Sequence, residues 1–385
     1  MSNILNKFNT ITNNKFVIAL MIFFFIVPMG IIDLFNAHLP MTLIRIILCL
    51  IVLIKYIPYL RENKKISPMT IVATIYCLGR FLITYIYSCD LISSLLSYSS
   101  FTIIILFMLV ECTVKENTRN LIEGIQIYCE IVIFINFLCL LFPKFGSFFD
   151  CDFFLEYDNN HFMYYILGIT VSFINYYLNK DKQSKIRMIL MCTIVLVTTF
   201  TVFSATAIIA FVTLALALLL LFKFNIGDIV SYVIFYFISF VSIIIFNVQH
   251  LFSFLIVDIL HKDITLSGRE TIWNAFKVEV LNSPLIGHGY QSDKLFVLNT
   301  YLYAHNHILN ELYCGGIIMY LVYIWFVILP AKKLLKNKDT NIAKVFSAII
   351  LSILVHSLCE SLSVVIFTFV YCLMYYIDVY IEKAN

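Results

Sequence analysis

The sequence predicts an all-α fold, a polytopic bundle of membrane-spanning helices. Of the 385 residues, 62% are hydrophobic and 13% are charged, whereas soluble domains carry about 25% charged residues. The mean hydropathy is +0.95, and the apolar residues come in runs of about 20, the length of helix that crosses a ~30 Å hydrocarbon core. Backbone groups in lipid must be paired within a segment, so these runs are expected to be helices rather than the short alternating strands of a barrel.

About twelve spans are expected from these runs. The longest stretch without a charged residue, Met188–Phe222, is too long for one crossing of a ~30 Å core. The polar stretch Thr201–Thr206 inside it is therefore predicted to be a turn between two spans. The predicted spans are residues 16–33, 41–58, 69–88, 92–110, 121–142, 161–178, 188–203, 205–222, 229–246, 307–329, 342–358 and 362–379.

Positively charged residues fall in alternate loops, which predicts the orientation of the bundle. Short cytoplasmic loops carry an excess of Lys and Arg, so both termini are expected to be cytoplasmic. The chain then divides into about nine helices in 1–246, one large extracytoplasmic loop in 247–306 and about three helices in 307–385. Long loops are more often functional than idle, so we expect this loop to carry the chemistry. The basic residues on the predicted cytoplasmic side include Arg61, Lys64, Lys65, Lys115, Arg119, Lys180, Lys182, Lys185, Arg187, Lys223, Lys332, Lys333, Lys336, Lys338 and Lys344.

An amphipathic helix is predicted within the loop, over residues 268–281. Ser267 and Glu270 match a capping box at its start, and the sequence Asn282–Pro284 should stop it. The following segment, Pro284–Tyr290, has two glycines around one residue and is expected to turn tightly. The apolar face of the helix combines Ile272, Trp273, Phe276 and Val280 at helical spacing.

Arg269 is the first candidate site residue in the loop. It falls in the first turn of the predicted helix, where free backbone N–H groups and the helix dipole already favour an anion. An arginine at this point suits a phosphate or pyrophosphate, and Trp273, one turn later, can stack on the guanidinium or on a ligand. The alternative is a surface arginine that caps its own helix or pairs with Glu270 or Asp263.

His305 is the second candidate, in the sequence Ala304-His305-Asn306-His307 at the predicted outer mouth of the tenth span. The positive end of a helix dipole opposes an imidazolium charge, and a neutral imidazole can act as general base for a sugar hydroxyl near pH 7. His307 and Glu311 are one turn apart and can pair. An interfacial polar belt without chemistry remains an alternative. A metal is a further alternative, but no third ligand is evident, so we expect no metal site and no cofactor.

Ionisable residues within the predicted spans are further candidates, because charges in lipid are costly and usually face the bundle interior. Arg45 and Arg80 lie in the outer parts of the second and third spans. They can line an outward-facing cavity for an anionic head group. The alternative is structural pairing, for example with Glu130. His356 and Glu360 lie near the outer end of the eleventh span and receive no assigned role.

About 50 residues of the loop and its flank resemble, in order and spacing, the signature of the O-antigen polymerase and ligase family. Members of that family are bacterial inner-membrane glycosyltransferases of the C-type fold that use polyprenyl-linked sugars. The matching positions are Ser267-Gly268-Arg269, Trp273, Pro284, Gly287, Gly289, His305-Asn306, Leu309, Glu311 and Gly315-Gly316.

The resemblance implies a reaction between two glycans. A hydroxyl of the acceptor glycan attacks the anomeric carbon of a polyprenyl-pyrophosphate-linked donor, and polyprenyl pyrophosphate leaves. Carried over to this chain, Arg269 holds the pyrophosphate and His305 activates the acceptor hydroxyl, with inversion and without a metal. A chain-length regulator becomes a possible partner, and nothing in the sequence indicates nucleic-acid binding. The residues expected to contact substrate or pyrophosphate are Arg80, Arg45, Trp273, Asn306, His307 and Glu311.

One departure from the family pattern favours a polymerase of O-antigen or capsule repeat units over a ligase. Ligases of the family commonly carry a Ser-Arg pair in the turn between the seventh and eighth spans, whereas this turn reads Phe203-Ser204-Ala205-Thr206. A ligase that transfers glycan to lipid A-core stays an alternative, with Arg80 or Arg45 as its second phosphate contact. A lipid-linked oligosaccharide flippase is a rival of another class, although the sequence lacks the internal repeats typical of transporters. A receptor or structural membrane protein is a second rival.

Overall fold

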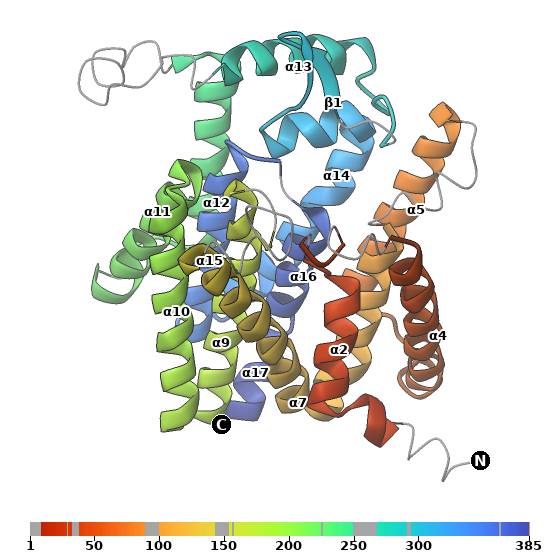
Figure 1. Cartoon of the computed structure of the whole chain (residues 1–385), viewed down its shortest axis with the longest axis vertical. Coiled ribbons are helices and arrows are strands. Elements are labelled where there is room, and N and C mark those ends of the chain that lie inside the picture. The colour runs from red at the N-terminus through yellow and green to blue at the C-terminus, as the bar shows by residue number, and fades with distance from the viewer. Residues whose placement is uncertain are drawn as a thin grey trace.

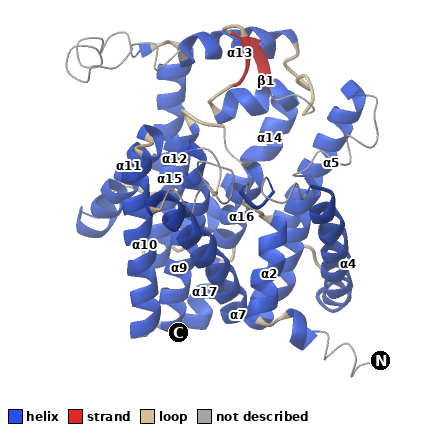
Figure 2. Cartoon of the chain, in the orientation of Figure 1, coloured by secondary structure: helices blue, strands red, loops and turns tan. Residues whose placement is uncertain are grey.

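The computed structural model describes residues 9–28, 30–32, 38–88, 100–142, 154–155, 158–224, 226–248, 268–290, 294–361 and 363–384. These residues are mostly helical, with one small two-stranded sheet (Figure 2). Most helices run along the longest axis of the molecule, and α13 lies across one end of them (Figure 1). The principal elements are α2 (Lys15–Phe25), α4 (His38–Asn63), α5 (Pro68–Ser88), α7 (Ser100–Leu141), α9 (His161–Asn179), α10 (Lys182–Val202), α11 (Ala205–Leu219), α12 (Ile229–Phe240), α13 (Arg269–Asn282), β1 (Lys294–Val297), β2 (Thr300–Tyr303), α14 (His307–Lys336), α15 (Asn341–Ser357), α16 (Val364–Tyr375) and α17 (Ile377–Ala384).

Six helices in the described part of the chain are long and apolar enough to cross a membrane, or seven if α16 and α17, bent by 48°, form one span. Three shorter apolar helices lie at Lys15–Phe25, Ile229–Ile245 and Asn341–Ser357. Large apolar side chains such as Phe237, 60% exposed, cover the outer faces of several helices, as contact with lipid requires. A membrane bundle is therefore supported, whereas the count of twelve spans and the predicted sidedness are not confirmed.

Helix α7 bends sharply at Asn117, whose backbone is not helical (φ −142°, ψ 55°). Residues on both sides of the bend are tied to the start of α2. Asn120 Nδ2 donates to the Asn13 carbonyl at 3.0 Å, and Thr113 Oγ1 accepts at 2.7 Å from Lys55 Nζ, which also donates to the Asn13 side chain. The described part of the fourth predicted span, residues 100–110, and the fifth predicted span, residues 121–142, thus fall almost wholly within one helix that bends at Asn117.

The turn predicted within the long uncharged stretch is confirmed. Helix α10 ends at Val202, Phe203 adopts a left-handed conformation, and Ser204 caps α11 by accepting a hydrogen bond from Ala207 N. A serine hydroxyl satisfies one of the free N–H groups that every helix start leaves open. The polar residues thus end one helix and begin the next inside an otherwise apolar run.

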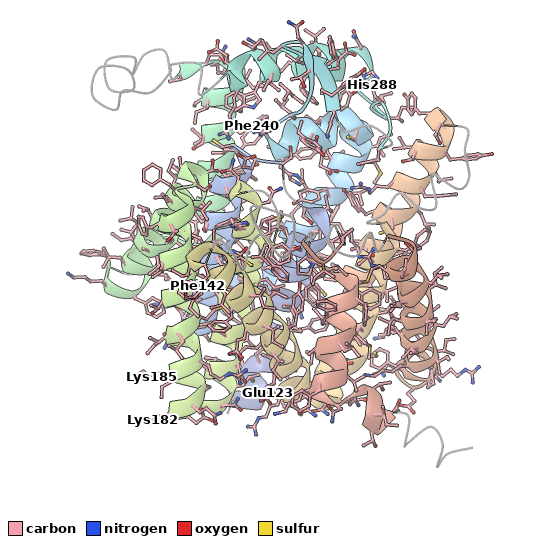
Figure 3. All side chains as sticks on the ribbon, viewed as in Figure 1. Glu123, Phe142, Lys182, Lys185, Phe240 and His288 are labelled. Atoms are coloured by element: carbon pink, nitrogen blue, oxygen red, sulfur yellow. The ribbon has the colours of Figure 1, made fainter. Side chains whose placement is uncertain are left out.

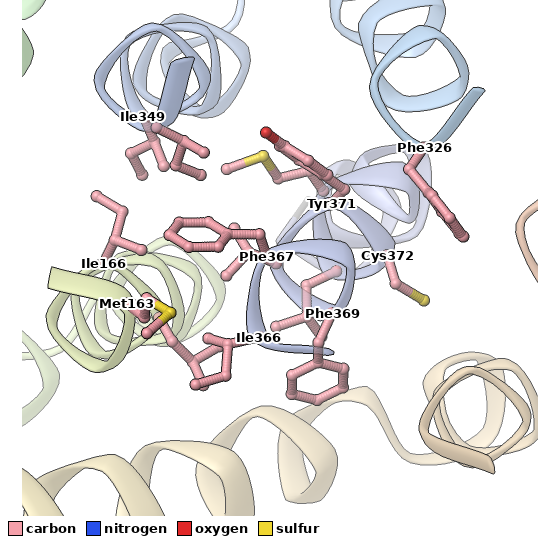
Figure 4. Packing of buried hydrophobic residues seen from close by; sticks show 14 of the residues in the cluster. Met163, Ile166, Phe326, Ile349, Ile366, Phe367, Phe369, Tyr371 and Cys372 are labelled. Atoms are coloured by element: carbon pink, nitrogen blue, oxygen red, sulfur yellow. The ribbon is translucent and has the colours of Figure 1, made fainter. Parts of the chain in front are cut away.

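The centre of the bundle is packed around α16. Figure 4 shows Phe367 of α16 beside Ile166 of α9, and Tyr371 of α16 between Ile349 of α15 and Phe326 of α14. All five side chains are at most 1% exposed. Interlocked side chains of this kind hold α9, α14 and α15 in fixed relative positions, and these three helices carry much of the candidate site.

The two ends of the bundle can be identified by the residues that lie there. Figure 3 places Lys182 and Lys185 at one end and His288 at the opposite end. We call these the lysine end and the α13 end. The sequence predicted that the basic loops and the termini share one face, and this stays a prediction.

The expectation of an all-α fold is wrong in one place, the hairpin β1–β2 at the α13 end. Its strands pair antiparallel, with Val297 opposite Thr300. The connecting residues Leu298 and Asn299 both have positive φ, 52° and 64°, as a type I′ turn requires. This turn usually contains Asn-Gly or Asp-Gly, and the sequence Leu298-Asn299 lacks that signal.

Candidate active site

Helix α13 positions Arg269 as its first residue. The predicted range of 268–281 is close to the observed one, but the N-cap is Gly268, in a left-handed conformation (φ 81°), without a side-chain cap. Ser267, the predicted cap, lies outside the described residues. The predicted apolar face is confirmed, since Trp273 and Phe276 are fully buried. Trp273 therefore belongs to the packing beneath the helix rather than to an open ligand surface.

A lysine on α13 fastens the helix to the end of α12. Lys277 Nζ donates to the Ile244 carbonyl at 3.0 Å, in the π-helical turn Val241–Ile245 that extends α12. Partial burial lowers the pKa of this ammonium group from its ordinary value, and Glu270 opposes that shift. The contact holds α13 against the end of α12, and it thereby helps to fix the position of Arg269.

Helix α14 is folded back on itself at Gly316, whose backbone is far from helical (φ 64°, ψ −171°). The rings of His307 and Tyr323 lie 4.6 Å apart, whereas a straight helix would separate residues 16 positions apart by about 24 Å. The first arm, 307–315, therefore runs back along the second arm, 317–336. The start of α14, which follows His305, consequently lies beside Tyr323 of the second arm.

The segment predicted to turn tightly after α13 closes the break in α14. Ile317 N and Ile318 N, which have lost their helical partners, donate to the Pro284 and Leu285 carbonyls at 2.9 and 3.2 Å. In return, the amide N–H of His288 donates to the Tyr313 carbonyl at 2.8 Å. This segment therefore supplies the backbone hydrogen bonds that the broken helix leaves open.

Glu360 joins the two predicted catalytic residues. One carboxylate oxygen lies 2.5 Å from Arg269 Nη2 and the other 3.1 Å from His305 Nδ1. The Glu360 side chain is 6% exposed, whereas those of Arg269 and His305 are 19% and 32% exposed. A buried carboxylate thus holds two partly open groups that come from different elements, and both remain accessible to a ligand.

Asn159 binds the Glu360 carboxylate, and two further polar residues hold Asn159 in place. Asn159 Nδ2 donates to Glu360 Oε1 at 2.7 Å, and Ser204 Oγ donates to Asn159 Oδ1 at 2.6 Å. His356 Nε2 lies 3.2 Å from the Asn159 carbonyl. The predicted turn before α11 therefore reaches the site through its serine, although the turn lacks an arginine.

Asn306 locks the start of α14 next to this cluster. Its Nδ2 donates to the Leu358 carbonyl at 3.0 Å, and its Oδ1 accepts from Leu309 N at 3.0 Å. Asn306 is fully buried, so its part is to position His305 rather than to touch substrate. The contact with Leu358 also brings the chain before Glu360 against the chain after His305.

His305 has an unusual backbone and one open ring nitrogen. Its φ is 44°, a left-handed conformation that is uncommon for residues other than glycine and that often marks functional sites. Nδ1 faces Glu360, and within the described part of the chain Nε2 has no partner. With Nδ1–H donated to the carboxylate, Nε2 can accept a proton from a hydroxyl.

Arg80 and Glu311 form a second, buried cluster. Arg80 Nη1 donates to Tyr76 Oη at 3.0 Å and lies 3.9 Å from Glu311 Oε1, and its guanidinium stacks 3.9 Å from the Tyr290 ring centroid. Both tyrosines donate to Glu311 Oε2, at 2.8 and 3.1 Å. The predicted pair between His307 and Glu311 is not formed, because the tyrosines and Arg80 surround the carboxylate.

Arg45 lies outside both clusters. Its Nε donates to the Phe24 carbonyl at 2.7 Å, between α4 and α2. The suggested structural partner Glu130 instead binds Arg187 through two hydrogen bonds of 2.8 Å each. Of the predicted residues, the structure therefore brings Arg269, His305 and Asn306 together. It places Arg80, His307 and Glu311 in a second group. Arg45 lies between α4 and α2, and Trp273 is buried beneath α13.

The contribution of the buried Arg80–Glu311 pair to the stability of the protein can be tested by substitution. We expect Arg80→Met to lower the free energy of unfolding by about 3–5 kcal/mol, because removing one partner leaves the other buried without a counter-charge. The double variant Arg80→Met/Glu311→Met should be more stable than Arg80→Met alone. Thermal unfolding of the purified protein in detergent measures both. Arg61→Met is the control, because Arg61 is an exposed arginine near the end of α4, and it should change the free energy of unfolding by less than about 0.5 kcal/mol.

Glu360 is the site residue to which the sequence assigned no role. A carboxylate in an apolar run was a signal of function, but nothing in the sequence connected residue 360 with residues 269 and 305. Asn159 carried no signal of its own, and Ser204 was placed in a turn but not at the site. The chain matches no protein-family model and no curated protein.

Proposed function

We propose that the protein is a glycosyltransferase that joins polyprenyl-pyrophosphate-linked oligosaccharide repeat units into an O-antigen or capsular polysaccharide, at the extracytoplasmic face of a bacterial inner membrane. One observation carries the proposal. Arg269 and His305, the residues to which the family resemblance gives the two chemical roles, both bind Glu360. Their common carboxylate supports a single site where an anionic leaving group and an acceptor hydroxyl meet.

His305 acts as the general base. Its Nε2 takes the proton of the acceptor hydroxyl while the hydroxyl oxygen bonds to the anomeric carbon of the donor. Glu360, bound to Nδ1, sets the direction of the ring and stabilises the imidazolium that forms. The left-handed backbone at His305 supports this role, because strain of this kind persists only where the surroundings impose it.

Arg269 stabilises the leaving group. The bond from the anomeric carbon to the pyrophosphate oxygen breaks with its electron pair, and negative charge builds on the pyrophosphate. A guanidinium carries five N–H donors, and Glu360 Oε1 takes a hydrogen bond from Nη2, so other donors are left for phosphate oxygens. A fixed cation at the place where charge develops is among the strongest catalytic effects.

The turn at Ser204 supports a polymerase over a ligase. In ligases of the family this turn commonly carries an arginine after the serine, whereas Ala205 follows Ser204 here. Arg80 and Arg45 do not replace it, because each is bound to protein groups of its own. The proposed acceptor is therefore a second lipid-linked glycan rather than lipid A-core.

The test is made in a host that lacks its own copy of the gene, with surface polysaccharide separated on a gel. His305→Ala should lower polymer synthesis by about 10²–10⁴-fold, the contribution of a positioned base. Arg269→Ala should lower it by about 10²–10³-fold, as for other charge-stabilising groups. Both strains should retain a single repeat unit on the lipid anchor, and membrane protein levels are measured in parallel.

Lys294→Ala is the control, since this cation lies on the exposed hairpin strand β1 and should leave the ladder intact. Polymer that accumulates on polyprenyl pyrophosphate in the two variants would instead identify a ligase. An unchanged ladder in both variants would remove the catalytic assignment and favour a flippase.

A further inference from the structure

A polar cavity lies where the start of α12, the end of α14 and the first turns of α15 meet. Its volume is about 270 Å³, close to the lower end of the ~300–1,000 Å³ that is usual for small-ligand sites. None of the residues that line it belongs to the Arg269–His305–Glu360 cluster. The charged and polar lining residues are Asp228, Ser231, Lys338, Asp339, Lys344 and Ser347.

This cavity lies at the lysine end of the bundle. Lys333 Nζ, in the last turn of α14, is 2.9 Å from Asp378 Oδ2 of α17. At the other end of α17, the Ala384 carbonyl accepts a hydrogen bond of 3.0 Å from Lys180 Nζ, just before α10. The end of α14 and the start of α10 are therefore joined through α17. The sequence predicts that this end faces the cytoplasm.

The cavity lining carries two groups of each charge. Lys338 and Lys344 supply the cations, and Asp228 and Asp339 the carboxylates. Asp228 caps α12 with one oxygen only, since Oδ1 accepts from both the amide N–H and the hydroxyl of Ser231 at 2.8 Å. Its second oxygen, Oδ2, takes no part in the cap. Paired cations and carboxylates of this kind suit a head group that carries both a phosphate and an ammonium.

A buried hydroxyl without a partner stands behind one wall of the cavity. Tyr232 is 6% exposed, and its hydroxyl has no hydrogen-bond partner among the described residues. Gly227 separates it from the cavity, because a Cβ added to this wall residue would be 3.0 Å from Tyr232 Oη. A buried polar group without a partner is costly, so a phosphate that reaches past Gly227 would stabilise the hydroxyl.

The polar cavity continues into an apolar groove between α12 and α14. The two share Ile229 and Leu335 as lining residues. One leaflet of a ~30 Å hydrocarbon core is about 15 Å deep, or about ten residues of helix. From Leu335 that length of α14 reaches Ile324, which also lines the groove. Ile234 on the same groove is 54% exposed, so an acyl chain can enter from the side of the bundle.

We propose that the cavity and the adjoining part of the groove bind one molecule of phosphatidylethanolamine from the leaflet at the lysine end. Its phosphate lies between Lys338 and Lys344, and its ammonium group meets Asp228 and Asp339. One acyl chain follows α14 from the cavity to Ile324. The bound lipid thereby joins α12 to the turn between α14 and α15. The proposal does not depend on the proposed function, and its test needs no catalysis.

The first experiment measures lipid binding to the purified full chain in detergent by native mass spectrometry. Phosphatidylethanolamine, phosphatidylglycerol and phosphatidylcholine are compared with identical acyl chains. Phosphatidylethanolamine should bind about 10-fold more tightly than the other two, because only its head group can donate charge-assisted hydrogen bonds to the carboxylates. Equal binding of the three lipids would overturn the proposal.

A soluble competitor separates a lipid site from a site for a free phosphate ester. Phosphoethanolamine carries the same charges without an acyl chain, so it should compete about 100-fold less well than the lipid, since each buried CH₂ group contributes to binding. Competition by phosphoethanolamine that equals competition by the lipid would assign the cavity to a soluble ligand and overturn the proposal.

The lysines are tested by a double substitution. Lys338→Ala/Lys344→Ala should lower the affinity for phosphatidylethanolamine on the order of 10-fold, because each lysine near a phosphate-bearing surface contributes about 1 kcal/mol, or about 5-fold. The matched control is Lys336→Ala/Lys383→Ala, which removes the same charge from the last turns of α14 and α17. These two lysines do not line the cavity. Equal losses in the two double variants would overturn the proposal.

The carboxylates are tested by a change of preference rather than a loss. Asp228→Asn/Asp339→Asn keeps the cap of α12, since asparagine caps a helix as well as aspartate, but it leaves only the two cations in the cavity. This variant should prefer phosphatidylglycerol over phosphatidylethanolamine. Misfolding would not reverse a preference between two lipids. An unchanged preference for phosphatidylethanolamine would show that the carboxylates do not meet the ammonium group and would overturn the proposal.

Discussion

Exchange of Glu360 for glutamine is expected to lower polymer synthesis on the order of 10²–10⁴-fold, the range that a positioned general base contributes. Glutamine keeps the size of the side chain and can still accept from Arg269. It removes the negative charge that stabilises an imidazolium at His305, 3.1 Å away. Because one carboxylate serves both partners, the variant weakens the base and the pyrophosphate contact together. The measurement is the polysaccharide ladder, followed by the rate in purified protein.

Two comparisons separate this effect from a loss of folding. Glu360→Asp restores the charge but is shorter by one methylene, so it should reach only one of its two partners well and give activity between glutamine and wild type. Glu130→Gln removes a carboxylate of α7 that binds Arg187. Glu130 is not part of the Arg269–His305–Glu360 cluster, so this variant should leave the kcat unchanged. If Glu360→Gln retained more than half of the ladder at normal protein level, the carboxylate would have no part in the chemistry.

Gly316→Ala is expected to have the largest effect on stability, about 4 kcal/mol or more, because a strained backbone and a steric overlap add together. The backbone at Gly316 (φ 64°, ψ −171°) lies in a region that only glycine occupies readily. A Cβ there would stand 2.3 Å from the Leu285 carbonyl carbon and oxygen. The segment after α13 would have to withdraw, and the hydrogen bonds from Ile317 and Ile318 would break. Thermal unfolding in detergent measures the loss.

Gly268→Ala is the control for the steric part. Gly268 also has a positive φ of 81°, but the nearest atom to its added Cβ would be 3.7 Å away. Only the backbone term then applies, so the expected loss is about 1 kcal/mol. Similar losses at the two positions would show that the contact between the segment and the break in α14 does not stabilise the fold.

The sequence predicted the helices well where local chemistry decides. A turn lies within Thr201–Thr206 and Ser283 ends α13 as expected, because turn residues and proline act within a few residues. The fold-back of α14 was missed, because residues 307–329 read as one membrane span. The adjacent glycines Gly315-Gly316 were a signal, but their partner is the segment at Leu285, and such distant contacts do not follow from a local pattern.

The sequence predicted only part of the candidate site, because the other contacts join residues that are distant in the chain. Arg269 and His305 stood out because charged and titratable residues at helix starts have recognisable chemistry. Glu360 was visible as a carboxylate in an apolar run, yet its place between the other two depends on the packing of α15 against α9 and α14. Arg80 was expected to face a ligand, whereas Tyr76 and Tyr290 enclose it, and no pattern in the sequence links these tyrosines to it.

The left-handed backbone of His305 sets stability against activity in this protein. Glycine and asparagine adopt a φ near 44° more readily than histidine, so the chain would fold more easily with either residue at position 305. Selection for thermostable variants alone would therefore tend to replace the proposed base, since relief of strain at functional sites commonly raises stability and lowers activity. An engineering programme that seeks a more robust protein should hold position 305 fixed and look for gains elsewhere in the bundle.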